Sequence, residues 1–165
     1  MQKNGLAALI WSDSCVLILG SLPGDESLAL QQYYADRRNQ FWRILTGVYN
    51  EQLPNDYDSK VNFLRLKALA LWDVTARADR MGSTDAKLQD AAPDDFPALL
   101  TAHRGLRLIV FNGKRAQELF ERLVQPEITR LLYGLRIQRL PSSSSVWARE
   151  TLEEKIAKWR LIATA

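Results

Sequence analysis

Four short apolar segments alternate with amphipathic stretches, and this alternation constrains the fold more than any other feature. The segments lie at residues 16–19, 69–72, 106–111 and 135–140. Strands separated by helices pair in parallel, and a parallel sheet buries both faces under helices. The central strands of such a sheet need near-continuous apolar runs. The last segment alternates apolar and polar residues, which is typical of an edge strand. The sequence therefore predicts an α/β fold, a three-layer α/β/α sandwich with a central four-stranded parallel sheet.

Helix signals occur between the predicted strands. Amphipathic spacing predicts helices over residues 39–48 and 94–102, and a further helix runs from Asp58 or Ser59 to Ala68. Gly113 precedes another helix, and Thr151 with Glu154 forms a capping box for the last one. No linker or change of composition interrupts this order, so we expect a single domain over residues 1–165.

The composition narrows the class of protein. The chain has 165 residues, of which 47% are hydrophobic and 25% charged, so it is long and apolar enough to bury a core. A net charge of +3 is compatible with a polyanionic partner but lies far below a histone-like excess. One cysteine and one histidine exclude a disulfide framework, a four-cysteine iron–sulfur cluster and a Cys/His zinc site.

The N-terminal region carries a weak signal-peptide pattern. Residues 5–11 are apolar and follow Lys3, but Asp13 interrupts the run and no small-residue cleavage pattern follows. The apolar run at residues 16–19 is too short to span a bilayer. We therefore expect a cytoplasmic protein without a membrane partner.

Polar or Gly/Pro-rich clusters follow each predicted strand. They occupy residues 20–24, 73–75, 112–114 and 141–145. Each cluster alone is an ordinary turn signal. Ligands of open parallel sheets bind at the carboxyl ends of the strands, where all four clusters meet. Their coincidence predicts a composite site on this edge.

Several familiar sites are excluded by their motifs. Neither a dinucleotide fingerprint nor a P-loop is present, so a nucleotide cofactor has no support. Ser21 follows Gly20 directly, so the segment does not match the G-x-S-x-G motif of serine hydrolases. A small-molecule hydrolase using Ser21 would also lack a base, because His103 precedes the third strand, at the opposite edge of the sheet. We expect His103 to end a helix and Cys15 to lie in the core.

Taken in order, these segments resemble the uracil-DNA glycosylase superfamily, and within it the hypoxanthine (deoxyinosine) DNA glycosylase branch. The resemblance covers residues 15–160 approximately. It rests on Leu-Gly-Ser-Leu-Pro-Gly at 19–24, Gln-Gln-Tyr-Tyr at 31–34, Arg-Asn-Gln-Phe-Trp at 38–42, Ala-Leu-Trp-Asp-Val at 70–74, Val-Phe-Asn-Gly-Lys at 110–114 and Leu-Pro-Ser-Ser-Ser at 140–144. It implies an enzyme that flips a deaminated base out of DNA and hydrolyses its N-glycosidic bond.

Two positions separate this chain from the uracil-excising and mismatch-specific branches. Leu22 stands where those branches have a catalytic Asp or Asn, and Leu140 stands where the uracil branch has His. The hypoxanthine branch shares both changes and carries its catalytic amide in the Arg-Asn-x-Phe-Trp segment, at Asn39 here. Its last motif usually continues with Pro-Ala, where this chain has Ser145 and Val146.

The resemblance assigns a role to each residue of the composite site. Asn39 would be catalytic, although Asn is also a common helix N-cap. Asp73 and Asn112 have alternative interpretations as a cap and a turn residue. Val146 or Trp147 would fill the space left by a flipped nucleotide, with Trp147 alternatively in the core. The implied base-binding residues are Gly20, Ser21, Tyr34, Asp73 and Asn112, and the implied DNA-binding residues are Pro23, Gly24, Arg38, Lys114, Ser142, Ser143 and Ser144.

The expected function is excision of hypoxanthine from double- or single-stranded DNA containing deaminated bases. We expect a monomer that uses neither a metal nor an organic cofactor. A uracil or mismatch-specific glycosylase is the same-class alternative, and Leu22 and Leu140 argue against it. A DNA-binding module without catalysis is the other alternative, and Asn39 argues against that one.

Overall fold

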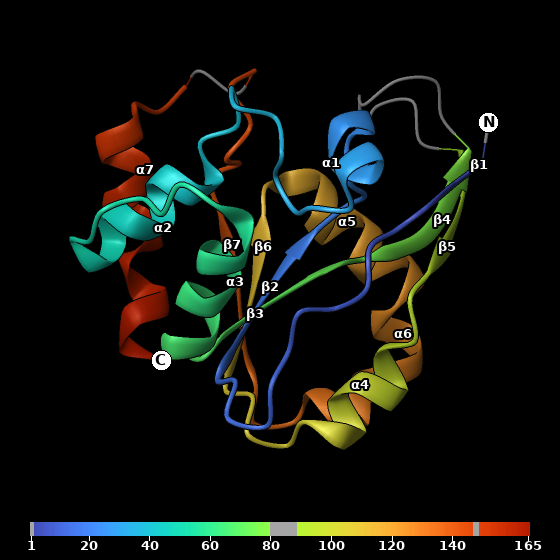
Figure 1. Cartoon of the computed structure of the whole chain (residues 1–165). Helices are drawn as coiled ribbons and strands as arrows, with labels where there is room; N and C mark the ends of the chain where they lie inside the picture. Colours follow the sequence, from blue (N-terminus) through green and yellow to red (C-terminus); the bar gives the residue numbers. More distant parts are fainter. Residues whose placement is uncertain (1, 80–88, 147–148) are drawn as a thin grey trace.

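A four-stranded parallel sheet lies at the centre of the molecule (Figure 1). The computed structural model describes residues 2–79, 89–146 and 149–165. The strand order is β3-β2-β6-β7, and every neighbouring pair is parallel. The strands are β2 (Val16–Gly20), β3 (Leu69–Asp73), β6 (Leu108–Asn112) and β7 (Arg136–Leu140). The predicted fold class is confirmed, and each strand lies within two residues of its predicted start.

Alternate residues of each central strand enter two separate cores. In β2, Val16 and Ile18 pack into one apolar cluster, whereas Leu17 and Leu19 pack into the other. All four side chains are buried. Successive side chains of a strand point to opposite faces, so a strand covered on both sides must be apolar at every position.

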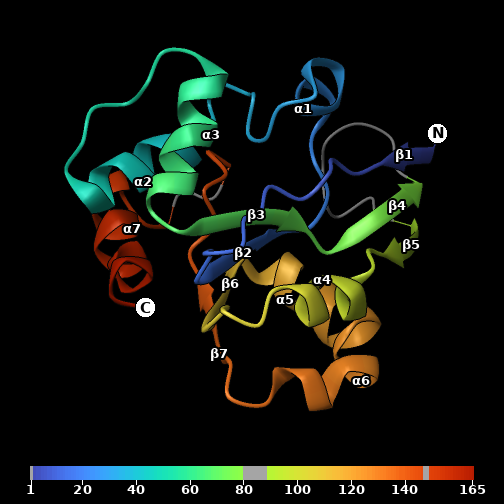
Figure 2. The same ribbon diagram turned by 60° about the horizontal axis from the view of Figure 1, so that its bottom comes forward.

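Helices cover both faces of the sheet, as Figures 1 and 2 show from two directions. Between them and the sheet lie the two apolar clusters. One face carries α2 (Phe41–Tyr49), α3 (Tyr57–Leu66), α7 (Leu152–Trp159) and the 3-10 turn Arg160–Thr164; the other carries α4 (Phe96–Ala102), α5 (Lys114–Leu123), α6 (Gln125–Ile128) and the 3-10 turn Thr129–Leu132. The helix α1 (Asp25–Leu30) follows the carboxyl end of β2. The three-layer arrangement follows directly from the double-sided sheet.

The start of α2 differs from the prediction. Gln40 occupies the N-cap and the helix begins at Phe41, not at Asn39. Asn39 still stabilises the start of α2, because its Oδ1 accepts a hydrogen bond from the backbone N–H of Phe41 at 2.9 Å. The polar side chain thus acts from one position before the cap.

The other helix caps follow common capping chemistry. Asp56 caps α3 by accepting from Ser59 N, so neither Asp58 nor Ser59 is the cap. Asp95 caps α4, which begins at Phe96 rather than at residue 94. The predicted cap of α7 is confirmed, since Thr151 Oγ1 accepts from Glu154 N at 3.1 Å.

Two features of the strands were not expected. A second, antiparallel sheet joins β1 (Gln2–Asn4), β4 (Thr75–Asp79) and β5 (Gln89–Pro93). The strand β7 is the predicted edge strand, but it buries only Leu140, and its Ile137 is 38% exposed. The prediction of an edge strand is confirmed, and the alternating apolar residues stay mostly exposed because little of the chain covers this edge of the sheet.

Three further predictions concern residues outside the site. His103 follows α4 at the amino edge of the sheet, with Nδ1 2.9 Å from Leu99 O, so the predicted helix-end position is confirmed. Cys15 is half-buried against the core. Leu9 pairs with Leu71, so part of the apolar N-terminal stretch is built into the fold. Within the described residues, no helix has the length and apolarity that crossing a bilayer requires.

Asp94 is expected to make the stability of the protein depend on pH. Burial raises the pKa of its carboxyl to about 7. The folded state therefore keeps this proton up to about pH 7, while the unfolded chain loses it near pH 4, so this group lowers stability as pH rises between those values. Because Asp94 is only partly buried, solvent screening reduces the effect of this shift, and we expect Asp94→Asn to stabilise the protein by about 2 kcal/mol at pH 8, with no gain near pH 4. Thermal unfolding across this pH range measures the difference.

The exposed Asp13 provides the matched control for this prediction. The Asp13→Asn variant makes the same substitution at an exposed position and is expected to leave thermal stability nearly unchanged. A gain from Asp94→Asn of equal size at pH 4 and pH 8 would contradict the account, since it could not arise from ionisation.

Candidate active site

A cavity of about 360 Å³ opens where the carboxyl ends of the parallel strands meet. Its lining includes residues from all four loops that follow those strands. The predicted composite site is therefore one continuous surface. Of the predicted site residues, those in the lining are Gly20, Ser21, Pro23, Gly24, Tyr34, Arg38, Asn39, Asp73, Asn112, Ser142, Ser143 and Ser144, whereas Lys114 is absent from it.

Because Gly20 has no side chain, Asp73 and Tyr34 can pack close to the end of β2. Gly20 pairs in register with Asp73 across the two strand ends. A Cβ atom at this position would lie 2.9 Å from Asp73 Oδ1 and 3.1 Å from the Tyr34 hydroxyl oxygen. Glycine is required here because any side chain would displace both polar groups.

Backbone contacts fix the loop that follows Gly20. Val74 N donates to Gly20 O at 2.8 Å, and Thr75 donates to Ser21 O from both its backbone N–H (3.2 Å) and its hydroxyl (2.8 Å). Thr75 is fully buried. The sequence marked residues 73–75 only as a cluster, and nothing in it showed that Thr75 holds the first loop in place.

Two adjacent tyrosines have different environments. Tyr33 is buried, its hydroxyl donates to Ala7 O at 2.9 Å, and burial raises its pKa far above the usual range. Tyr34 adopts a positive φ of 52°, stacks on Phe41 with a centroid distance of 3.9 Å, and lines the cavity. A left-handed backbone at a bulky residue is costly and clusters at functional sites. Tyr33 is also among the lining residues, but it is only 4% exposed, whereas Tyr34 is half-buried, so Tyr34 is the more accessible ring for a ligand.

Asn112 links three parts of the site. Its Nδ2 donates to the Tyr34 hydroxyl at 2.9 Å and to Ser143 Oγ at 2.8 Å, and its Oδ1 accepts from Ser143 N at 2.8 Å. Both amide hydrogens are thus directed at protein groups, and Oδ1 keeps a second lone pair. The residue positions the aromatic ring and the last loop relative to the end of β6.

Asn39 presents an amide at the cavity. Its Oδ1 is held by the N–H of Phe41 and its own backbone N donates to Asp36 O at 2.9 Å. Among the residues that the structure describes, none accepts a hydrogen bond from Nδ2 of Asn39. The rotamer is therefore fixed by the helix start while the donor end of the amide stays available.

Asp73 and Leu22 are buried parts of the cavity lining. Asp73 ends β3 and is 4% exposed, and its negative charge contributes to the raised pKa of Tyr33. Leu22 is 6% exposed and offers only apolar atoms. The site thus combines a carboxylate and an amide with an apolar wall.

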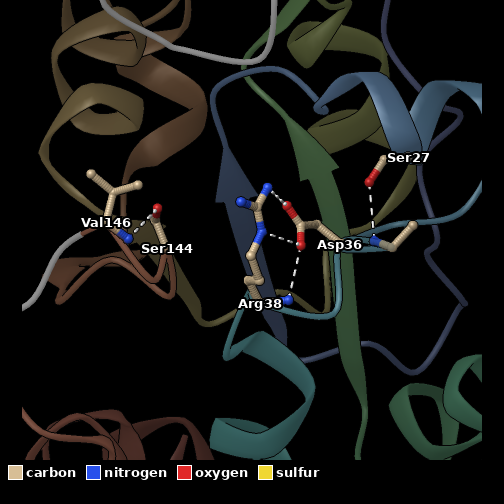
Figure 3. A network of polar contacts seen from close by, with 6 residues as sticks. Ser27, Asp36, Arg38, Ser144 and Val146 are labelled. Atoms are coloured by element: carbon tan, nitrogen blue, oxygen red, sulfur yellow. Dashed lines mark hydrogen bonds and ion pairs between the residues drawn. The ribbon is translucent and has the colours of Figure 1, made fainter.

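An ion pair lies at the rim of the cavity (Figure 3). The guanidinium of Arg38 donates to both carboxylate oxygens of Asp36, at 3.1 Å and 2.9 Å, and these bonds lower the pKa of Asp36. The Arg38 side chain is 83% exposed. Figure 3 also shows Ser27, whose Oγ accepts from Ala35 N and so holds this segment to α1.

In the last loop of the site, residues 141–146, serine hydroxyls accept hydrogen bonds from backbone N–H groups of the same loop. Ser142 Oγ accepts from Ser144 N at 3.1 Å, and Ser144 Oγ accepts from Val146 N at 3.3 Å, the latter drawn in Figure 3. Gly113 has a φ of 96°, and a Cβ there would lie 3.0 Å from Ser142 Cβ, so the loop packs directly on the start of α5. Val146 is 91% exposed, and Trp147 lies outside the described residues.

The cationic residues near the site are arranged unevenly. Lys114 is exposed and follows Gly113, and its Nζ lies 3.6 Å from Glu118 Oε1. Arg139 lies one residue from the carboxyl end of β7. Arg136 begins β7 and pairs with Leu108 at the amino edge, about 13 Å of strand away from the site. Arg136 therefore lies at the opposite edge of the sheet from the last loop.

Lys155 and Gln40 hold together two segments that line the cavity, and the sequence did not predict this role. Lys155 is 1% exposed, and its ammonium donates to Gln40 Oε1 at 2.8 Å. A signal was present: Lys155 lies three residues after Leu152 and four before Trp159, on the apolar face of its helix. A lysine at such a position indicates a buried charge with a specific partner.

No group of His, Cys, Asp and Glu side chains within the described ranges has the arrangement of a metal site. The expectation that no metal or organic cofactor is used stays a prediction. The titratable groups of the cavity are carboxylates, tyrosines and the guanidinium of Arg38, and its neutral polar groups are amides and hydroxyls. Such a set can bind and orient a polar ring and a water molecule.

Comparisons with known proteins agree with one another. Residues 11–163 match the family model described as the uracil DNA glycosylase superfamily. Two curated proteins named hypoxanthine DNA glycosylase are similar to this chain: one from Methanosarcina acetivorans is 36% identical, with 98% of each chain covered, and one from Methanosarcina barkeri is 34% identical, with 96% of each covered. A solution NMR structure from Methanosarcina acetivorans, described as a candidate uracil DNA glycosylase, superimposes with a TM-score of 0.80 at 36% identity, covering 98% of this chain and 99% of the other.

Proposed function

This chain belongs to the uracil DNA glycosylase superfamily, and on that premise we propose that it hydrolyses the N-glycosidic bond of deaminated bases in DNA, chiefly hypoxanthine. The proposal rests chiefly on the amide of Asn39, which presents a hydrogen-bond donor at the cavity. In the same cavity the buried Leu22 stands where other branches of the superfamily have a catalytic Asp or Asn. The two relatives named hypoxanthine DNA glycosylase support the choice of base.

The target nucleotide must leave the duplex before the cavity can hold its base. Flipping costs a few kcal/mol and costs least for a poorly paired base. The extruded base stacks on Tyr34, whose ring is supported from behind by Phe41 at 3.9 Å. This support fixes the platform before the substrate arrives, so little order has to be created on binding.

Hydrolysis proceeds through breakage of the C1′–N9 bond, with positive charge developing on the sugar. Asn39 donates from Nδ2 to the attacking water or to the base, and its fixed Oδ1 keeps that donor in place. Backbone N–H groups of residues 20–24 stabilise negative charge on the leaving base. The water oxygen bonds to C1′, a proton from that water passes to the departing purine, and an abasic sugar with a C1′ hydroxyl remains.

Recognition of the base rests on Asp73. An ionised carboxylate accepts the N1–H of hypoxanthine, and adenine has no hydrogen at N1. Adenine also presents an amino group where hypoxanthine presents the O6 acceptor. The pairing of a carboxylate acceptor with N1–H therefore favours the deaminated base over the normal one.

Phosphate contacts come from the rim. Small hydroxyls and backbone N–H groups of Ser142, Ser143 and Ser144 suit close approach to phosphates, and Pro23 and Gly24 border the same cavity. Arg38 and Lys114 add charge from exposed positions. Val146 is the exposed apolar side chain available as the wedge. We retain a monomeric, cytoplasmic enzyme as a prediction.

Asp36→Asn is expected to tighten DNA binding. The substitution removes a negative charge at the rim and releases Arg38 from its two-point contact. We expect affinity to rise about two- to five-fold for duplexes with and without inosine, and the salt dependence to steepen by about 1. Fluorescence anisotropy across a salt series measures both quantities.

Asp58→Asn is the matched control, because Asp58 is an exposed acid on α3 outside the cavity lining. It makes the same charge change away from the rim and should alter affinity much less. Equal effects of the two variants would show that net charge alone is responsible and that the ion pair has no part.

The substrate is tested with a panel of duplexes that carry inosine, uracil, xanthine or no lesion. After incubation and alkali, we expect strand cleavage to be greatest for inosine and absent for the undamaged duplex. Cleavage of uracil alone would favour the uracil-specific alternative. Binding without cleavage of any duplex would favour a non-catalytic DNA-binding module.

A further inference from the structure

A buried lysine lies beneath the site and has no part in the chemistry described above. Lys155 belongs to α7, whose buried face packs on the sheet through Trp159. Its side chain is 1% exposed and is among the largest fully buried side chains of the described residues. A charge removed from water needs specific partners to offset its desolvation.

The partners of Lys155 come from two loops of the site. Its ammonium donates to Gln40 Oε1 at 2.8 Å and to the Ser144 carbonyl at 3.3 Å. The backbone N–H of Gln40 donates in turn to Ser143 O at 2.9 Å. The segment that carries Asn39 and the serine loop are thus joined twice, once directly and once through Lys155.

Stability alone does not account for a cation at this position. An apolar side chain of similar length would fill the same space without the desolvation penalty, and such replacements of buried charges are often neutral or stabilising. Desolvation also lowers the pKa of Lys155, as expected for an ammonium buried among protein groups. The benefit of the ammonium therefore lies in where it holds Gln40 and Ser144.

We infer that Lys155 is a positioning residue of the glycosylase reaction, which clamps the Asn39–Gln40 segment to the serine loop so that the amide and the phosphate-binding loop keep one relative position. This inference rests on the function proposed above. Reacting groups displaced by about 1 Å can lose about 10²-fold in rate. Phosphate binding by the loop itself depends less on the clamp, because Lys155 does not reach the surface.

The first test is Lys155→Met, which keeps an unbranched apolar stem and removes the ammonium. With saturating enzyme, we expect single-turnover excision of hypoxanthine to fall by about 10- to 100-fold, while the dissociation constant for the inosine duplex changes less than about threefold. Lys158→Met is the matched control, because Lys158 lies on the same helix and pairs with Glu150 at an exposed position. This control should leave the rate unchanged.

A double-mutant cycle separates positioning from a general loss of structure. If Lys155 acts through Asn39, the loss caused by Lys155→Met should nearly vanish in an Asn39→Ala background. An equal loss in both backgrounds would overturn the inference. So would a folded Lys155→Met variant that retains the wild-type rate.

Gln40→Ala provides a second test of the clamp if Lys155→Met does not fold. Gln40 makes no side-chain cap bond to α2, so its truncation should leave the helix intact while releasing one side of the clamp. We expect a rate loss in the same direction, and a wild-type rate in this variant would overturn the inference.

Amide hydrogen exchange provides a readout that does not depend on activity. Loss of the clamp should lower the protection of the Gln40 amide, which donates to Ser143 O. Unchanged protection in a folded Lys155→Met variant would refute the clamp, whatever the enzyme excises. Failure of the wild-type protein to excise any base would instead refute the proposed function, and the exchange experiment would still decide on the clamp.

Discussion

Asn39→Ala is expected to slow excision of hypoxanthine by about 10²–10³-fold in single-turnover experiments with saturating enzyme. Loss of one preorganised polar contact to a developing charge costs about 3–4 kcal/mol, which corresponds to that factor. The amide is preorganised because its Oδ1 already accepts from Phe41 N. DNA binding should stay nearly unchanged, since Asn39 is not expected to contact phosphates.

Asn39→Asp is the matched control for the amide. It keeps an oxygen for the N–H of Phe41 and removes the Nδ2 donor, so folding should be preserved while the reaction is lost. Leu22→Ala should loosen packing and cost far less chemistry, because Leu22 has no polar atom. Near-normal rates in Asn39→Ala would contradict the assignment and make Asp73 the next residue to test.

Tyr34→Ala is expected to lower single-turnover excision by about 10- to 100-fold, the equivalent of about 1–3 kcal/mol of base–aromatic stacking. The ring stacks on Phe41 and its hydroxyl accepts from Asn112, so both partners lose a neighbour. The Tyr34→Phe variant keeps the stacking surface and should retain most of the activity. The rates are measured with the same inosine duplex.

Tyr33→Phe is the control for the neighbouring ring. It removes the hydroxyl that donates to Ala7 O, and we expect it to reduce stability without changing the excision rate. If Tyr34→Ala and Tyr33→Phe affected the rate equally, stacking on Tyr34 could not be the source of the effect.

Most of the fold could be predicted from the sequence because the central strands are buried on both faces. A strand such as β2 must be apolar at every position, and a short apolar run bounded by turn residues is typical of such a strand. The parallel sheet then brings the four loops to one edge. The predicted site residues of these loops, except Lys114, line the cavity for this reason, whereas Tyr34, Arg38 and Asn39 reach it from the segment between α1 and α2. Their individual roles remain proposals.

Features that depend on tertiary contacts could not be predicted. The strands β4 and β5 have no apolar run, so the second sheet left no pattern in the sequence. The hydrogen bond from Asn112 to the Tyr34 hydroxyl joins residues 78 positions apart, and no pattern in the sequence indicates the positive φ of Tyr34. The clamp made by Lys155 joins residues 115 positions apart.

The most direct test of the central claim is mass spectrometry of the products formed from an inosine-containing duplex. Hydrolysis by water should release free hypoxanthine and leave an intact strand with one abasic site, which breaks only after alkali or heat. No lysine is expected to attack the sugar, so borohydride should trap no protein–DNA adduct. Release of no free base, or a strand already broken with a trapped covalent adduct, would contradict hydrolysis by water at the Asn39 site.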